Sequence, residues 1–179
     1  MKLLSAILVT AALATATPLT ARDELITAQT LISDISNINA GVESLRKDVA
    51  AYDGSLLSET RLVADFTAIH LANRKGFLDA NLRQAPFNAS DSHDIVQFTI
   101  DSVGVSIPAA VEETKAKKAL FEKSGQDAVI AGTLKVLLND HDTFSAPLVA
   151  KLTADLERGQ AVVAKIHDSI QSGIDYFSS

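Results

Sequence analysis

The residues of this chain that could perform chemistry are few, because it contains four histidines and no cysteine. No two histidines are close enough in sequence to share one helix face as a metal-binding pair does; they are His70, His93, His141 and His167. Residues 139–142, Asn-Asp-His-Asp, offer oxygen and imidazole ligands, but consecutive side chains point around a helix in different directions. We therefore expect a polar helix end here and no metal site. Without a thiol, cysteine nucleophiles and cysteine-ligated metal or haem sites are excluded.

Motifs of catalysis are also missing from the sequence. Glu112 and Glu113 are adjacent, so their carboxylates do not face one another as the acid pair of a glycosidase does. There is no glycine-rich phosphate loop, no G-x-S-x-G elbow and no H-E-x-x-H helix. We expect no catalytic residue, no cofactor and no enzyme. The alternative that stays open is a catalytic triad assembled from residues distant in sequence.

The first residues have the three parts of a secretory signal peptide. Lys2 supplies a positive charge, residues 3–14 are apolar or small, and residues 14–16 form an Ala-Thr-Ala cleavage site. We expect cleavage after Ala16, giving a signal peptide at 1–16 and a single helical-bundle domain at 17–179. The alternative is an N-terminal membrane anchor, for which the apolar run is short.

The mature chain is acidic and is expected to be secreted. Loss of Lys2 leaves 15 of the 16 basic residues against 22 acidic ones, a net charge of −7. An acidic surface disfavours nucleic acid and anionic membranes as partners. We expect no transmembrane segment after the signal peptide and, because residues 174–179 lack a hydrophobic tail, no GPI anchor. The sequon Asn-Ala-Ser predicts an N-linked glycan at Asn88.

Two long apolar stripes, with steps of three and four residues, predict two long amphipathic helices. The first helix is expected from about Glu24 to Tyr52, and its stripe is Ala28, Leu31, Ile35, Ile38, Val42, Leu45, Val49 and Tyr52. The last helix is expected to follow a turn at 143–147, and its stripe is Val149, Leu152, Leu156, Gly159, Val163, Ile166, Ile170, Gly173 and Phe177. We expect the first stripe to be scaffold.

Three further helices are predicted between these two, at about residues 56–84, 92–124 and 126–141. Pro108 lacks an N–H and clashes with the preceding turn, so a kink or break of the third helix is expected near it. No segment has the alternating pattern of a strand. The prediction is an all-α fold, a five-helix bundle with antiparallel neighbours joined by short loops.

The stretch Ile95–Ile107 is more apolar than one helix–helix contact requires. Together with Gly159 and Gly173 in the last stripe, it could line a cavity. The alternative is the central helix of a dry, fully packed core, which is the commoner role of buried aliphatic side chains.

Three segments resemble a known family in their order and spacing. Residues 45–54 (LRKDVAAYDG) close a first helix, residues 114–121 (TKAKKALF) match a central "KK-x-x-F" segment, and residues 173–177 (GIDYF) match a closing "GIDAF"-type segment. Pro108 falls where the family carries a proline within a helix. The chain from about Glu24 to Phe177 resembles the fungal hydrophobic surface-binding protein A family, also called cell wall galactomannoproteins, with Mp1-like lipid-binding domains.

This resemblance implies a secreted or wall-associated protein that adsorbs to hydrophobic surfaces or holds a fatty acid in an apolar cavity between helices. Candidate cavity residues are Phe66, Ile69, Phe98, Ile100, Val103, Ile107, Leu134, Leu138, Leu152, Val163 and Ile166. Candidates for the polar headgroup are Asn73 and Thr99, which are polar within apolar faces. One hypothesis is a non-catalytic protein that binds a fatty acid. The other is a surface-active structural or cell wall protein without a specific ligand, with cell wall polysaccharide as a further candidate partner.

Overall fold

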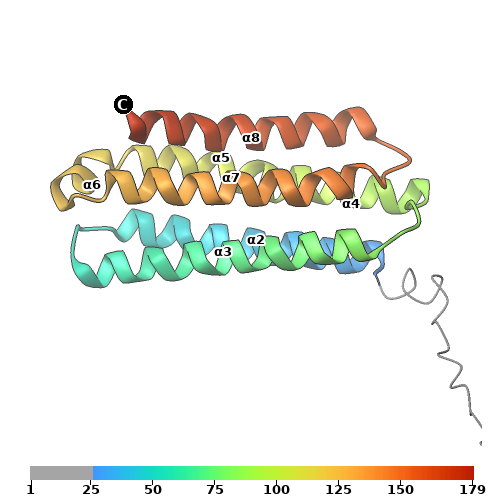
Figure 1. Ribbon diagram of the computed structural model, residues 1–179, viewed down its shortest axis with the longest axis horizontal. Coiled ribbons are helices and arrows are strands. Elements are labelled where there is room, and N and C mark those ends of the chain that lie inside the picture. The colour runs from blue at the N-terminus through green and yellow to red at the C-terminus, as the bar shows by residue number, and fades with distance from the viewer. Residues whose placement is uncertain (1–25) are drawn as a thin grey trace, which may run out of the picture.

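The computed structural model describes residues 26–179, and these residues form helices and no strand. The long helices lie side by side along one axis, and consecutive ones run antiparallel (Figure 1). The elements are α2 (Ala28–Ala51), α3 (Leu56–Leu82), α4 (Ala89–Asp101), α5 (Val103–Lys115), α6 (Lys118–Ser124), α7 (Asp127–Val149) and α8 (Leu156–Ser178). The all-α prediction is confirmed, whereas the prediction of five helices is wrong.

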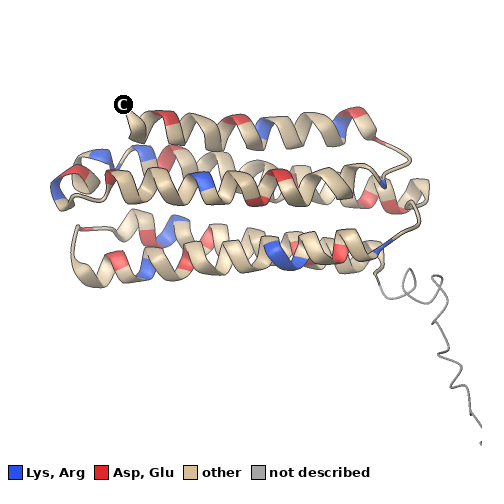
Figure 2. Ribbon diagram, in the orientation of Figure 1, with Lys and Arg blue, Asp and Glu red and all other residues tan. Residues whose placement is uncertain are grey.

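Five of these helices close a ring around a central space. Helix α2 packs on α3, α3 on α7, α7 on α8, α8 on α5, and α5 again on α2. Each of these helices buries apolar side chains on the face that it turns toward the interior, and the charged residues of both signs are scattered over the helices (Figure 2). The stripe of α2 is buried from Ala28 to Tyr52, as predicted.

The ends of the first two helices follow capping chemistry. The Thr27 hydroxyl accepts a hydrogen bond from the N–H of Thr30, and the Thr30 hydroxyl accepts one from the N–H of Thr27. This capping box starts α2 at Ala28, after the predicted start at Glu24, which lies outside the described residues. The Ser55 hydroxyl caps α3 by accepting a hydrogen bond from the N–H of Ser58, after Gly54 turns the chain with a φ of 81°.

The third helical region is divided into three helices, and the break is not at the proline. The backbone departs from helical geometry at Ser102, with φ −107° and ψ −97°, and again at residues 116–117 between α5 and α6. Pro108 lies inside α5. Its missing N–H frees the carbonyl of Gly104, which accepts a hydrogen bond of 2.8 Å from the Lys165 ammonium of α8. The predicted kink near Pro108 is therefore wrong, because a neighbouring helix satisfies the freed carbonyl.

Helix α7 continues through the segment predicted to be a turn. Phe144 and Leu148 extend its buried stripe, and Pro147 lies in its last turn. The real connection is residues 150–155, so α8 begins at Leu156 and not near Val149. Backbone hydrogen bonding explains this position, because the N–H of Phe87 donates to the carbonyl of Lys151 over 2.8 Å. The buried Phe87 thereby joins this connection to the loop after α3.

The segment Ala89–Lys115 is long and apolar enough, by length and composition, to cross a membrane. That no transmembrane segment follows the signal peptide stays a prediction, because this criterion rests on length and composition alone. The segment is interrupted at Ser102, and Ile95, Val96 and Val103 are buried in the bundle. The segment thus packs into the bundle at these three positions, whereas Val105 is exposed.

The glycines of α8 bring helices together and do not leave space. A methyl group built on Gly173 would lie 3.0 Å from Leu134 and 3.1 Å from Val111. One built on Gly159 would lie 3.2 Å from Leu152. Close approach at these two positions therefore depends on the absence of a side chain, and the space inside the ring lies elsewhere.

Candidate functional site

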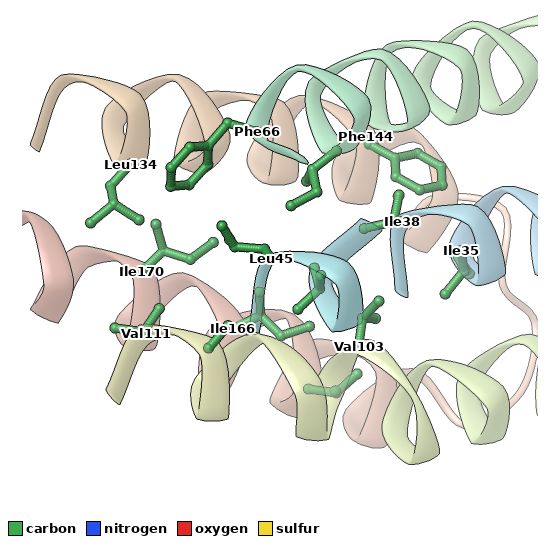
Figure 3. Close-up of a cluster of buried hydrophobic side chains, with 14 of the residues drawn as sticks. Ile35, Ile38, Leu45, Phe66, Val103, Val111, Leu134, Phe144, Ile166 and Ile170 are labelled. Atoms are coloured by element: carbon green, nitrogen blue, oxygen red, sulfur yellow. The ribbon is translucent and has the colours of Figure 1, made fainter. Parts of the chain in front are cut away.

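The ring of helices encloses an apolar cavity of about 90 Å³. Side chains from α2, α3, α4, α5, α7 and α8 converge on it, and Figure 3 shows ten of them labelled around the space between the helices. The wall is made of Ile35, Ile38, Val42, Leu45, Phe66, Ile69, Asn73, Thr99, Val103, Ile107, Ala110, Val111, Thr114, Leu134, Leu137, His141, Phe144, Ser145, Leu148, Val163, Ile166 and Ile170. An apolar wall with few polar groups is typical of a site for an apolar ligand.

Most of the residues predicted from the sequence lie on this wall. They are Phe66, Ile69, Val103, Ile107, Leu134, Val163 and Ile166, with the two headgroup candidates Asn73 and Thr99. Four predicted residues do not line it. Phe98, Ile100 and Leu138 are partly buried against the core, and Leu152 lies in the connection before α8 and packs beside Gly159. Whether any of these residues binds a ligand stays a prediction.

The sequence prediction missed the contribution of α2 and of the second half of α7. The middle of the α2 stripe lines the cavity at Ile35, Ile38, Val42 and Leu45, so this stripe is wall as well as scaffold. The sequence prediction placed Phe144 in the turn at 143–147 and Leu148 directly after that turn, where the last helix was expected to begin. The three-and-four steps Leu134, Leu137, His141, Phe144 and Leu148 continue across that turn and could have identified both residues.

The hydroxyl groups on the cavity wall are bonded to the main chain. Thr99 donates to the carbonyl of Ile95 over 2.8 Å, and Thr114 donates to the carbonyl of Ala110 over 2.7 Å. Ser145 donates to the carbonyl of His141. Each of these hydroxyl groups donates its hydrogen atom to a carbonyl of its own helix. The cavity wall therefore presents mainly apolar atoms to its interior.

The amide of Asn73 and the imidazole of His141 are engaged as well. The Asn73 amide nitrogen donates to the carbonyl of Ile69 over 3.0 Å. His141 Nε2 lies 3.0 Å from the carbonyl oxygen of Val163 and donates to it, which leaves Nδ1 without a proton when the ring is neutral. Burial lowers the pKa of His141 from its ordinary 6.5, because desolvation disfavours the imidazolium. The neutral ring keeps the cavity uncharged.

His141 gives a prediction on pH. Because its pKa is lowered in the folded state, the unfolded chain binds a proton first as the pH falls through 6.5. The free energy of unfolding should therefore fall on acidification, and the pH dependence should be shallower in His141→Gln. Urea unfolding at several pH values measures both slopes. The exposed His167, whose pKa is raised by Asp142, acts in the opposite direction and is common to both proteins. Equal slopes would contradict the assignment to His141.

Two buried carboxylates tie α3 to its neighbours. Asp34 of α2 lies 2.5 Å from the Lys75 ammonium, and Asp140 of α7 lies 2.6 Å from His70 Nδ1. Desolvation raises the pKa of Asp34, an effect that the bonded Lys75 partly offsets. Within residues 26–179 no group of three histidine, cysteine or carboxylate side chains is placed to hold a metal ion.

A second hollow opens between α3 and α7. Its volume is about 260 Å³, and Phe66 lines both this groove and the central cavity. The groove is lined by Tyr52, Glu59, Leu62, Val63, Phe66, Thr67, His70, Phe121, Gln126, Val129, Ile130, Thr133 and Val136. All three valines of this wall are about half exposed, so the mouth of the groove is apolar; they are Val63, Val129 and Val136.

The predicted glycosylation site lies on the surface. Asn88 is exposed and caps α4, with its side-chain oxygen accepting a hydrogen bond of 2.8 Å from the N–H of Asp91. Its amide nitrogen, the atom that would carry a glycan, donates to the exposed Asp91 carboxylate over 3.0 Å. A glycan would replace that weak surface bond and leave the cap in place.

Comparison with known proteins identifies the fold of this chain. The solved structure of AfMp4p in complex with palmitic acid has a TM-score of 0.80 and 22% identity, covering 84% of this chain and 99% of the other. Ligand binding domain 1 of the Penicillium marneffei MP1 protein, complexed with arachidonic acids, has a TM-score of 0.76 and 22% identity. The match covers 82% of this chain and 95% of that domain's chain. Ligand binding domain 2 of that protein, complexed with multiple arachidonic acids, has a TM-score of 0.74 and 22% identity. The match covers 84% of this chain and 94% of that domain's chain.

No protein with curated annotation matches the sequence. The sequence model of the family described as hydrophobic surface binding protein A matches residues 28–150, from the start of α2 to the end of α7. This match covers more than half of the chain and includes most of the cavity wall. The chain therefore belongs to the hydrophobic surface binding protein A family.

Proposed function

We propose that this protein is a secreted, non-catalytic carrier that holds a fatty acid or a similar single-chain amphiphile inside its ring of helices. The observation that supports this most is the central cavity, whose wall is mostly apolar and whose few polar side chains are hydrogen-bonded within the protein. Structures of the same fold hold palmitic acid and arachidonic acids. The absence of catalytic motifs from the sequence fits a carrier.

The energetics favour an acyl chain in such a cavity. Each buried methylene contributes about 0.8 kcal/mol, so a long chain supplies enough for micromolar binding or better. The cavity of about 90 Å³ is smaller than the roughly 300–1,000 Å³ of ordinary ligand pockets. Binding a whole fatty acid must therefore spread the helices or use the neighbouring groove between α3 and α7.

Titration calorimetry of the delipidated protein with palmitate tests the proposal directly. We expect saturable binding with a negative heat-capacity change, which marks burial of apolar surface. Native mass spectrometry of the protein purified from its own host should show bound lipid. A delipidated, folded protein that binds neither palmitate nor arachidonate would overturn the proposal.

A second candidate function, adsorption to hydrophobic surfaces, is favoured by the outer face of α3. Leu56, Val63, Leu71, Leu78 and Leu82 are exposed and follow one another at steps of seven, eight, seven and four residues. These steps place them on one side of the helix, where they make an apolar stripe that no described residue covers.

This stripe gives a prediction for adsorption. The double variant Leu71→Gln, Leu78→Gln should bind polystyrene beads about tenfold more weakly, because two exposed leucines no longer leave water at the surface. A matched control is Val105→Gln, Leu156→Gln, which removes exposed apolar side chains from α5 and α8. Depletion of protein from solution measures the binding. Equal losses in both variants would show that α3 is not the adsorbing face.

We further infer that the protein acts outside the cell or at the cell wall. The support is the signal-peptide pattern at residues 1–16, which lies outside the described residues, and the exposed sequon at Asn88. N-terminal sequencing of protein from the culture medium should begin at Thr17, and glycosidase treatment should lower its mass. Protein that stays in the cell with its first residues intact would contradict this.

A further inference from the structure

A fatty acid brings a carboxyl group that the central cavity is poorly equipped to receive. The hydroxyl protons of Thr99, Thr114 and Ser145 are donated to main-chain carbonyls, and the His141 N–H is donated to Val163. Only the amide of Asn73 keeps a second N–H. A buried carboxylate without donors is costly, so the acyl chain fits this cavity better than its headgroup does.

The groove between α3 and α7 offers what the cavity lacks. His70 lines it, and His70 Nδ1 lies 2.6 Å from Oδ2 of Asp140, whose side chain is 2% exposed. Nδ1 donates to this buried carboxylate, so the ring is held in one orientation and Nε2 is the atom free to meet a ligand. The His70 side chain is 40% exposed, which leaves it accessible from the groove.

His70 of the groove lies close to Phe66, the residue that the groove and the cavity share. The two residues are four apart on α3, so they lie one turn apart on the same face. Phe66 lines both hollows, and Figure 3 shows it among the side chains around the central space. Phe66 is therefore a wall shared by the two hollows, and an amphiphile with its head at His70 reaches the cavity with its chain by displacing this ring.

The charges around His70 fit an acidic headgroup. Arg74 follows His70 by one turn of α3, and the carboxylate of Asp140 is already paired with the imidazole. The acidic residue on the groove wall, Glu59, precedes His70 by eleven residues, which is about 16 Å along a helix. The acidic side chain on the groove wall thus lies far from His70, while the guanidinium of Arg74 lies over the Phe77 ring outside the groove wall.

We propose that the groove between α3 and α7 is the entrance to the cavity and that His70, oriented by Asp140, binds the carboxyl group of the fatty acid there. This proposal rests on the function proposed above and adds the polarity of binding: chain inward past Phe66, headgroup at the surface. A protonated imidazole donates to a carboxylate, and a neutral one accepts from a carboxylic acid. Either protonation state pairs with the headgroup.

Two ligands that differ only in the headgroup test this proposal, namely palmitate and hexadecanol. In His70→Gln we expect palmitate to bind about tenfold more weakly and hexadecanol to bind as before, because only the carboxyl group uses the charge-assisted bond. A structural role for His70 would weaken both ligands alike. The matched control is His93→Gln, which alters an exposed histidine paired with Asp155 over 2.6 Å outside the groove. It should change neither affinity.

In His70→Gln the buried Asp140 keeps only a weaker hydrogen-bond partner, which could destabilise the fold. A second variant therefore separates a loss of stability from a loss of binding. In the double variant His70→Leu, Asp140→Leu both polar partners are replaced by apolar ones, which folded proteins tolerate better than one unpaired group. The same selective loss of palmitate is expected once circular dichroism confirms the helices. Equal loss of both ligands, or no loss, would overturn the proposal.

Two further outcomes are separable from these. If Asn73→Leu weakens palmitate selectively and His70→Gln does not, the headgroup lies inside the cavity and our proposal is wrong. If the unaltered protein binds neither palmitate nor hexadecanol, the function proposed above fails, whatever the variants do.

Discussion

Leu137→Trp is expected to weaken palmitate binding at least about tenfold, whereas Leu138→Trp should leave the affinity within about twofold of the unaltered protein. The two leucines are adjacent on α7 and both are half-buried, but only Leu137 lines the central cavity. The larger indole at position 137 occupies space in the cavity of about 90 Å³ that an acyl chain would use. Two displaced methylenes, at about 0.8 kcal/mol each, account for the expected loss.

The measurement is titration calorimetry of both variants with palmitate. The chain contains no tryptophan, so the fluorescence of the introduced indole also reports its surroundings. We expect a more blue-shifted emission for position 137, where the ring enters an apolar cavity. Similar affinities in the two variants would show that palmitate does not occupy the central cavity. A loss at position 138 alone would place the ligand on another side of α7.

Leu31→Ala is expected to lower the free energy of unfolding by about 2–5 kcal/mol, the range for removing a fully buried leucine side chain. Leu31 is 0% exposed and lies in the α2 stripe outside the cavity wall. Its truncation removes apolar contacts and leaves a void in close-packed surroundings. A loss of this size is a large part of the total stability of a typical domain.

The matched control is Leu71→Ala on α3, where the side chain is 61% exposed. This change should alter stability by less than about 0.5 kcal/mol. Urea unfolding followed by circular dichroism gives both values. Because Leu31 does not line the cavity, palmitate affinity should be retained in Leu31→Ala at temperatures where it stays folded. Equal destabilisation by the two variants would contradict the burial that distinguishes these positions.

The apolar stripe of α2 contains residues that line the cavity and residues that pack only against other helices. Ile35, Ile38, Val42 and Leu45 line the cavity, while Leu31 and Val49 in the same stripe pack outside it. Substitutions within one stripe should therefore separate into those that change affinity and those that change only stability.

The secondary structure class, the buried faces of the first and last helices and the family could all be predicted from residue patterns along the chain. Steps of three and four residues in the first and last stripes require helices, because only a period near 3.6 places such residues on one face. The same periodicity identified Phe66, Ile69, Leu134 and Ile166 as interior. This information is local, since it depends on neighbours within two turns of one helix.

Which interior side chains line the cavity, and which pack against another helix, depends on how the helices are placed in the bundle. Leu137 and Leu138 are alike in the sequence, and one of them lines the cavity because of where α7 sits in the ring. Pro108 does not break α5 because a lysine of α8, 57 positions further along, satisfies the freed carbonyl. His70 meets Asp140 across 70 residues. Each of these three contacts depends on how helices distant in sequence are placed beside one another. A periodic pattern along one helix carries no information about that placement.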